Sequence, residues 1–318
     1  MRSFFKKAVW TGALILTFIL FSYTFSFAQS DDAKQELKQV PLAEGVLQAG
    51  QADKTLPAAS SRDVDTSVQM PKLSTLKMGF MLYHFDYKED FVPPGKSTNE
   101  GWLPGTFISY TFKKNSVFYT RFYGHYAAAE ITYDGATQAG TPIKINDPQK
   151  FFKLQWDFGY PWAIRDNFVL TPYLGVGYRY WERGEANYPN YKEVYTWGYI
   201  PVGLRIDYDI NDRWRVGGNV AANFMFGGNL KAYLSEVSAG APDLNFNLGN
   251  EVGWYAEFPV TYRFTNTWAL TATPWYEYST IGRSDTQSFR YGGIKYSAYE
   301  PSSTTNQFGI SLSADISF

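Results

Sequence analysis

The final residues of the chain, 308–318, alternate strictly between apolar side chains and small or polar ones. The apolar positions are Phe308, Ile310, Leu312, Ala314, Ile316 and Phe318. The positions between them are Gly309, Ser311, Ser313, Asp315 and Ser317. Because successive side chains of a strand point to opposite faces, this alternation predicts a β-strand with one apolar and one polar face.

The same aromatic-rich alternation recurs back to residue 75. It predicts ten strands, at about 75–87, 102–113, 116–133, 150–162, 168–183, 193–210, 214–226, 251–264, 268–280 and 304–318. Four connections are tight, at 113–115, 163–167, 211–213 and 265–267, and five are long, at 88–101, 134–149, 184–192, 227–250 and 281–303. Short and long connections alternate along the chain, which is typical of a closed antiparallel up-and-down barrel.

We therefore predict an all-β transmembrane barrel of ten strands over residues 73–318. The apolar face of each strand is expected to meet lipid and the polar face to line the interior. An even number of strands puts both ends of the barrel on one side, which we predict to be periplasmic. In the first strand two assignments stay open, because Met78 and Phe80 lie on one apolar face and Met81 and Tyr83 on the other.

The segment before the barrel has two parts. In residues 1–28, basic residues precede a mostly apolar run over 8–27, and Ser26 and Ala28 are small residues before Gln29. This pattern predicts a signal peptide cleaved after Ala28; the alternative is an uncleaved anchor, because the run is long enough to span a membrane. Residues 29–72 are rich in Ala, Gln, Ser, Asp and Pro, which predicts a flexible periplasmic linker. The alternative is a short helix near 32–43.

The composition narrows the possible chemistry. The chain contains no cysteine, so thiol catalysis and thiolate metal sites are excluded. A formal net charge of −1 gives no reason to expect a nucleic-acid partner. Aromatic residues make up 19% of the chain, and tyrosine and tryptophan gather where an apolar surface meets water. The chain has no phosphate-binding loop and no metal-ligand motif, so we predict neither a cofactor nor a metal.

Charged residues recur on the polar faces of the predicted strands. This predicted lumen charge network consists of Arg121, Asp157, Arg179, Arg205, Asp207, Arg215, Glu257, Arg263, Glu277 and Asp315. A barrel of this strand number is narrow, and unpaired charges inside it are costly, so the mixed signs favour ion pairs that fill the interior. The alternative is a thin polar conduit for small solutes.

The chain has only two histidines, His84 and His125. Asp86 is two residues from His84, so the two side chains share one face of the first strand, and the carboxylate could orient the imidazole as a base. His125 is expected to point into the barrel. A hydrogen-bonded structural histidine is the commoner case, so His84 and Asp86 are only weak catalytic candidates.

Together, the signal peptide, the alternating strands and the terminal Phe318 resemble bacterial outer-membrane β-barrel proteins of the Gram-negative envelope. Within that class, the terminal segment is similar to the one recognised by the barrel-assembly machinery; its matching residues are Phe308, Ile310, Leu312, Ile316 and Phe318. The length and strand count also resemble the omptin proteases, which carry an acidic pair and an Asp-x-His pair at the extracellular rim. Here the similar pair is His84 and Asp86 in reversed order, so the resemblance implies no catalytic residues.

Three functions are compatible with these observations. The first is a structural or surface-interaction role through the long loops 227–250 and 281–303, which carry Tyr233, Phe289 and Tyr291. The second is a narrow, porin-like pore, and the third is an omptin-like hydrolase at the rim. The expected partners are outer-membrane lipid, the barrel-assembly machinery during biogenesis and a surface ligand that the sequence does not identify.

Overall fold

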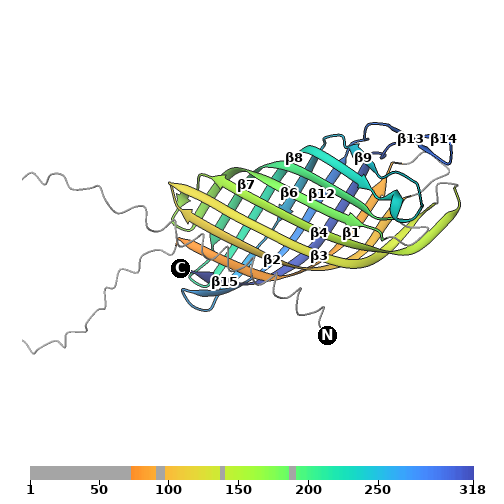
Figure 1. Cartoon of the computed structure of the whole chain (residues 1–318). Coiled ribbons are helices and arrows are strands. Elements are labelled where there is room, and N and C mark those ends of the chain that lie inside the picture. Colours follow the sequence, from red (N-terminus) through yellow and green to blue (C-terminus); the bar gives the residue numbers. More distant parts are fainter. Residues whose placement is uncertain (1–72, 91–96, 137–139, 186–190) are drawn as a thin grey trace, which may run out of the picture. The chain divides into compact units, whose positions relative to one another are not determined.

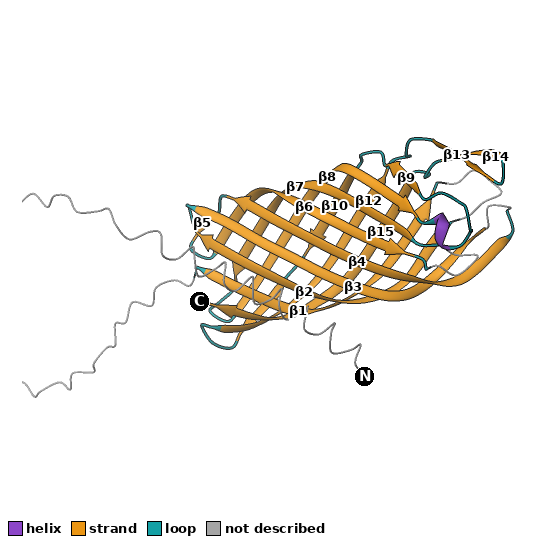
Figure 2. Ribbon diagram, in the orientation of Figure 1, coloured by secondary structure: helices purple, strands orange, loops and turns teal. Residues whose placement is uncertain are grey.

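The computed structural model describes residues 73–90, 97–136, 140–185 and 191–318 (Figure 1). The predicted signal peptide, 1–28, and linker, 29–72, lie outside the described residues. The secondary structure of the described residues is almost entirely β (Figure 2). A single turn of 3-10 helix, η1 (Leu234–Glu236), is the one helical element described, and none of the described helices is long and apolar enough to cross a membrane.

One antiparallel sheet forms the wall of the molecule. Its main strands are β1 (Ser74–Glu89), β2 (Thr98–Lys114), β3 (Phe118–Ala136), β4 (Pro142–Gly159), β6 (Phe168–Arg183), β7 (Glu193–Asp209), β8 (Trp214–Ala232), β10 (Val252–Glu257), β11 (Val260–Arg263), β12 (Trp268–Ile281) and β15 (Ser303–Ser317). Shorter strands are β5 (Trp162–Arg165), β9 (Leu244–Asn247) and the separate hairpin β13 (Gln287–Tyr291) and β14 (Ile294–Ala298).

The sheet closes on itself because β1 pairs with both β2 and β15. Where the first and last strands pair, Ser74 and Phe318 exchange two backbone hydrogen bonds, each 3.0 Å long. β10 and β11 together occupy one strand position in the barrel, since both lie between β8 and β12 in the same register. In the same way β5 continues β4 alongside β6. The prediction of a closed antiparallel barrel of ten strands is therefore confirmed.

Pro259 explains why β10 and β11 are separate. Proline has no N–H to donate to the ladder, yet the pairing with β12 continues in register from Glu257 with Trp275 to Val260 with Ala272. Phe258 still donates its N–H to the carbonyl of Pro274 at 3.0 Å, and Gly217 donates to the carbonyl of Pro259 at 2.8 Å. The wall therefore tolerates this proline without a register shift.

Several strands run further than the alternation predicts at the end with the long connections, here called the loop end. β2 begins at Thr98, β3 continues to Ala136, β4 begins at Pro142 and β8 continues to Ala232. In these extensions the outward residues are polar, for example Glu100 on β2 and Lys144 on β4, so no apolar period marks them. The opposite end, with the short connections, is here called the turn end.

The outward face of the wall is apolar and exposed around the barrel. Phe80 is 74% exposed, whereas Tyr83 of the same strand is fully buried, so Met78, Phe80 and Leu82 face outward and the open assignment of the first strand is resolved. Other outward side chains include Ile108, Trp156, Leu174, Val202, Val220, Trp254, Leu270 and Leu312. Such an apolar belt is typical of a wall that meets lipid.

Candidate functional site

The turn-end half of the lumen encloses a polar cavity of about 1160 Å³, here called the turn-end cavity. Asn115, Asp212 and Thr265 line it, so it reaches the short turns. At its inner limit lie Lys153 and Glu277. The polar faces of the strands build this cavity, because every second residue of the strands points inward.

Three ion pairs cross this half of the lumen and join strands far apart in the wall. Arg121 of β3 reaches Glu257 of β10 at 3.5 Å, and Lys153 of β4 reaches Glu277 of β12 at 3.2 Å. Each of these two pairs joins strands that lie five positions apart around the wall in either direction. Nearer the turns, Lys113 Nζ lies 2.6 Å from a carboxylate oxygen of Asp207. Charged side chains therefore link opposite walls of the barrel.

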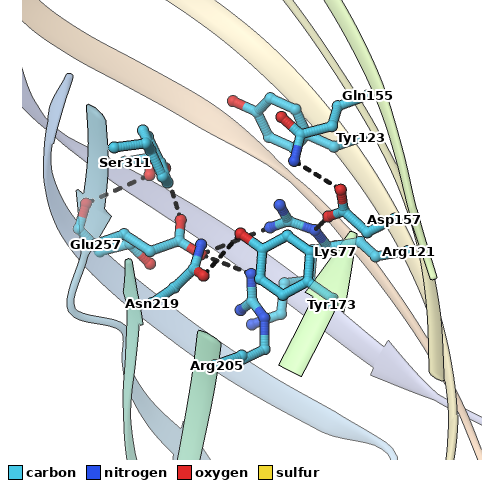
Figure 3. Close-up of polar contacts among 12 residues, drawn as sticks. Lys77, Arg121, Tyr123, Gln155, Asp157, Tyr173, Arg205, Asn219, Glu257 and Ser311 are labelled. Atoms are coloured by element: carbon cyan, nitrogen blue, oxygen red, sulfur yellow. Dashed lines mark hydrogen bonds and ion pairs between the residues drawn. The ribbon is translucent and has the colours of Figure 1, made fainter. Parts of the chain in front are cut away.

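The Arg121 pair belongs to a larger hydrogen-bonded group (Figure 3). Arg121 Nε donates to Asp157 at 2.9 Å, and the Asp157 side chain is fully buried. Arg205 donates to Glu257 at 2.8 Å, so Glu257 lies within ion-pair distance of two guanidinium groups. A carboxylate held by two arginines has the charge-assisted bonds that make burial of a charge tolerable.

Arg215, Arg263 and Asp315 are paired with residues outside the predicted network, whereas Arg179 is paired within it. Arg215 and Arg263 both bind Asp209, at 2.7 and 2.6 Å, and Asp315 binds Lys77 at 2.8 Å. Arg179 pairs with Glu277. Asp209 was the missed partner near the turns, and the missed lysines are Lys77, Lys113 and Lys153. The inward position of each in its strand period is the signal that could have found them.

The loop-end half of the lumen is filled by aromatic and aliphatic side chains, here called the aromatic core. Its largest members are Tyr83, Phe85, Tyr87, Phe151, Trp181, Tyr195, Trp197, Tyr199 and Trp275. Trp181 is at the centre of the ring contacts, stacked on Tyr195 with centroids 4.6 Å apart and on Phe151 at 5.6 Å. Phe85 and Tyr87 meet the edge of the same indole. This packing resembles the interior of a soluble protein more than a channel.

Between the two halves the described residues leave little space. The hollow above Lys153 measures only about 20 Å³ and is lined by Phe85, Trp181 and Gln307, among others. That volume is close to the space a single water molecule needs. The aromatic core therefore separates the turn-end cavity from the loops.

Above the aromatic core lies a buried group of charges, here called the carboxylate cluster: Arg183, Glu89, Glu193 and Glu300. Arg183 donates to Glu193 and, at 2.9 Å, to Glu89. Its guanidinium carbon also lies 5.0 Å from the centroid of Tyr87. One arginine and three carboxylates leave an excess of negative charge in a buried place, which a proton can remove.

Glu300 is the member of the carboxylate cluster that comes from a loop, between β14 and β15. Its carboxyl accepts hydrogen bonds from Tyr195 at 2.7 Å and Tyr87 at 3.3 Å. Burial, together with the neighbouring Glu89 and Glu193, raises the pKa of Glu300 to about 8. Through these hydrogen bonds Glu300 joins the last long loop to β7 and β1 at the mouth of the barrel.

The long connections at the loop end carry secondary structure of their own. β9 extends the edge of β8, and the β13–β14 hairpin stands at the far side of the loop end (Figure 1). Side chains join these loops: Asn247 donates its N–H to Asp285 at 2.8 Å, and the hydroxyls of Ser238 and Tyr291 are 2.7 Å apart. The connections 233–251 and 282–302 thus present one connected surface.

His84 faces outward. Its ring stacks on Phe308 with centroids 5.1 Å apart and meets Trp102 edge-on, and Nε2 lies 3.4 Å from a carboxylate oxygen of Glu100. Asp86 is on the same outward face, two residues nearer the loops. His125 lies inside the barrel, where its Nδ1 is 3.1 Å from the hydroxyl of Tyr123.

The weak catalytic pair is therefore on the outer wall, away from any cavity described. The terminal residues of the predicted assembly signal also face outward, and Phe308, Ile310, Leu312 and Phe318 are 46% to 60% exposed. Among the described residues no group of three or more histidine or acidic side chains is arranged to hold a metal ion.

No family model and no curated protein matches the chain. Among solved structures, the outer-membrane protease OmpT from Escherichia coli aligns with a TM-score of 0.53 at 9% identity, over 78% of this chain and 97% of OmpT. OprG from Pseudomonas aeruginosa aligns with a TM-score of 0.37 at 8% identity, over 78% of this chain and 97% of OprG. The toluene transporter TodX from Pseudomonas putida aligns with a TM-score of 0.31 at 8% identity, over 77% of this chain and 90% of TodX.

The likeness to OmpT is one of fold. A closed antiparallel wall, an apolar outer belt and an interior lined by polar and aromatic side chains define the class: the chain has the fold of an outer-membrane β-barrel protein.

Proposed function

We propose that this barrel is a surface-interaction protein that displays its loop end to partners outside the cell. The observation that carries the proposal is the contrast between a lumen filled beneath the loops and loops that are themselves folded. The aromatic core blocks the route through the barrel, and β9 with the β13–β14 hairpin builds a connected surface above it. Binding sites are commonly found on loops that a rigid scaffold positions.

The same orientation puts Ser74 and Phe318 at the periplasmic side, together with the short turns. It agrees with the signal peptide predicted for residues 1–28 and with an assembly signal on the outward face of β15. Lack of cysteine makes the orientation testable. Ser297→Cys at the loop end is expected to react with a membrane-impermeant maleimide on intact cells, whereas Asn266→Cys at the turn end reacts only after lysis. The reverse pattern would refute the orientation.

A narrow pore is the second candidate, and the turn-end cavity favours it. A conducting path would also need an opening through the aromatic core, where Trp181 is 2% exposed. Hydrolysis at the rim has less support, because His84 packs on Phe308 and Trp102 of the outer wall.

Two measurements on the refolded barrel test the proposal. In planar bilayers we expect insertion without discrete conductance steps. Replacing residues 286–299 with a short Gly-Ser linker should abolish binding of the protein to its surface partners while the barrel keeps its resistance to unfolding in detergent. Steady single-channel currents, or surface binding that survives the replacement, would overturn it.

A further inference from the structure

The β13–β14 hairpin has two chemically different faces. One face carries Phe289 and Tyr296, whose rings stack with centroids 5.5 Å apart, and Tyr291. Phe289 packs against the aromatic core, and the hydroxyl of Tyr291 lies 2.7 Å from that of Ser238. This face anchors the hairpin to the rest of the loop end, which matters because an isolated two-stranded hairpin is marginally stable in water.

The other face carries only polar side chains. Arg290 is directly opposite Lys295 in the ladder, and Ser288 is directly opposite Ser297, with their hydroxyl oxygens 3.2 Å apart. All four residues are exposed. Two cations and two hydroxyls thus form successive cross-strand pairs on one small surface, here called the cationic face.

Placing like charges directly opposite one another destabilises a strand pair. Neither Arg290 nor Lys295 has a carboxylate partner within ion-pair distance among the described residues. Two half-buried cations of the loop end do have one, since Lys192 pairs with Glu236 at 2.6 Å and Lys231 with Asp243 at 3.8 Å. An anion bound between Arg290 and Lys295 would convert their repulsion into attraction.

The position of the hairpin sets it apart from the apolar belt that meets lipid. Tyr276 of β12 lies directly opposite Phe308 of β15, and both are outward-facing aromatic residues. From this pair the two strands continue toward the loop end as far as Ile281 and Ser303, where the loop begins. Outward residues along this stretch are polar, Asn306 and Thr304 among them. The hairpin therefore stands clear of the apolar belt, in water.

We propose that the cationic face binds sulfate or phosphate ester groups of an extracellular polysaccharide. Guanidinium, ammonium and hydroxyl groups are all donors to tetrahedral oxyanions, and arginine can bind two oxygens of one such group. A polysaccharide presents these groups repeatedly, which suits a small exposed surface of low individual affinity. This inference deepens the proposed surface-interaction role and rests on it.

The test uses the refolded barrel in a zwitterionic detergent, with fluorescent dextran sulfate, phosphorylated dextran and neutral dextran as probes. We expect both charged dextrans to bind and neutral dextran not to bind. Arg290→Ala with Lys295→Ala should weaken binding by about tenfold for each cation lost, and added salt should weaken binding of the unaltered protein. Binding of neutral dextran, or no binding of either charged dextran, would overturn the inference.

Two further variants separate charge at this face from charge in general. Lys114→Ala with Arg165→Ala removes two exposed cations at the turn end and should leave binding unchanged. Arg290→Glu creates an opposite-charge pair with Lys295, so it should protect the hairpin from proteolysis yet abolish binding. An equal loss in the turn-end variant, or retained binding after Arg290→Glu, would contradict the proposal.

A last arm tests the source of the anion. Vesicles containing phosphatidylglycerol should not compete with dextran sulfate; effective competition would assign the face to lipid headgroups and refute the polysaccharide. If the hairpin replacement abolishes surface binding while the Arg290 and Lys295 variants retain it, the surface-interaction role stands and only this inference fails.

Discussion

The two halves of the barrel interior are closed in different ways. At the loop end, aromatic rings pack on one another around Trp181, and the hollow that borders them measures about 20 Å³. At the turn end, ion pairs cross a cavity of about 1160 Å³. The loop-end half is therefore packed like a protein core, whereas the turn-end half leaves its outermost charges, Arg215 and Arg263, partly exposed.

The physical reason is the cost of burying charge. Removing two ions from water costs several kcal/mol each, which their attraction only partly returns. The turn-end cavity reaches the short turns, so water can solvate the free sides of Arg215 and Arg263. Aromatic rings have no such requirement, so the loop-end half can exclude water. Where charge does recur there, as at Glu300, a proton neutralises it.

The largest expected effect is on the aromatic core. Trp181→Ala should lower the free energy of unfolding by about 5 kcal/mol, because the indole contacts four rings and its removal leaves a cavity. Urea titration of the refolded barrel measures the change. Trp254→Ala, on the outward face, is the matched control and should cost less than half as much; equal losses would mean that the loop-end half is no core.

Breaking an ion pair that crosses the lumen comes next. Glu277→Ala leaves Lys153 and Arg179 without their carboxylate and should cost about 3 kcal/mol of unfolding free energy. Glu182→Ala, which breaks the more exposed pair with Lys150, should cost under about 1 kcal/mol. Bilayer recordings of the Glu277 variant should stay silent, since the aromatic core still closes the lumen. Conductance in this variant would instead make the ion pairs the barrier.

A smaller effect concerns pH and the carboxylate cluster. The pKa of Glu300 rises from 4.5 to about 8 on folding, so the folded chain holds the proton more tightly than the unfolded one. The stability from this group is full below pH 4.5 and falls as pH rises through 8. Limited proteolysis of residues 282–302 should therefore be faster at about pH 9 than at about pH 6. These two conditions lie about one unit above and about two units below the pKa of Glu300. Glu300→Gln should remove the difference; a variant with the same pH response would place the titration elsewhere.

The smallest effect is expected on the outer wall. His84→Ala loses ring contacts with Phe308 and Trp102 and should change the free energy of unfolding by about 1 kcal/mol or less. Binding at the loop end should not change. If the purified barrel hydrolyses peptide or lipid and this variant does not, His84 and Asp86 would be catalytic residues after all.

Much of the barrel could be predicted from the sequence because period two is a local property. It gave the ten strands, the alternation of turns and loops, and the inward side of strands such as β4, where Lys153 and Asp157 are buried and Trp156 is exposed. The strand ends at the loop end were predicted too short, since their outward residues are polar. The hairpin with Arg290 and Lys295 was predicted only as part of a long loop.

What the sequence determined by itself is therefore the kind of wall: ten strands, each with one apolar and one polar face, joined alternately by short and long connections. What only the tertiary structure decided is which inward residues meet. Alternation assigns a side chain to a face, but the height at which Arg121 meets Glu257 depends on the stagger of four intervening strands. The same closure, and no local pattern, brought Arg183 and Glu300 together beneath the loops.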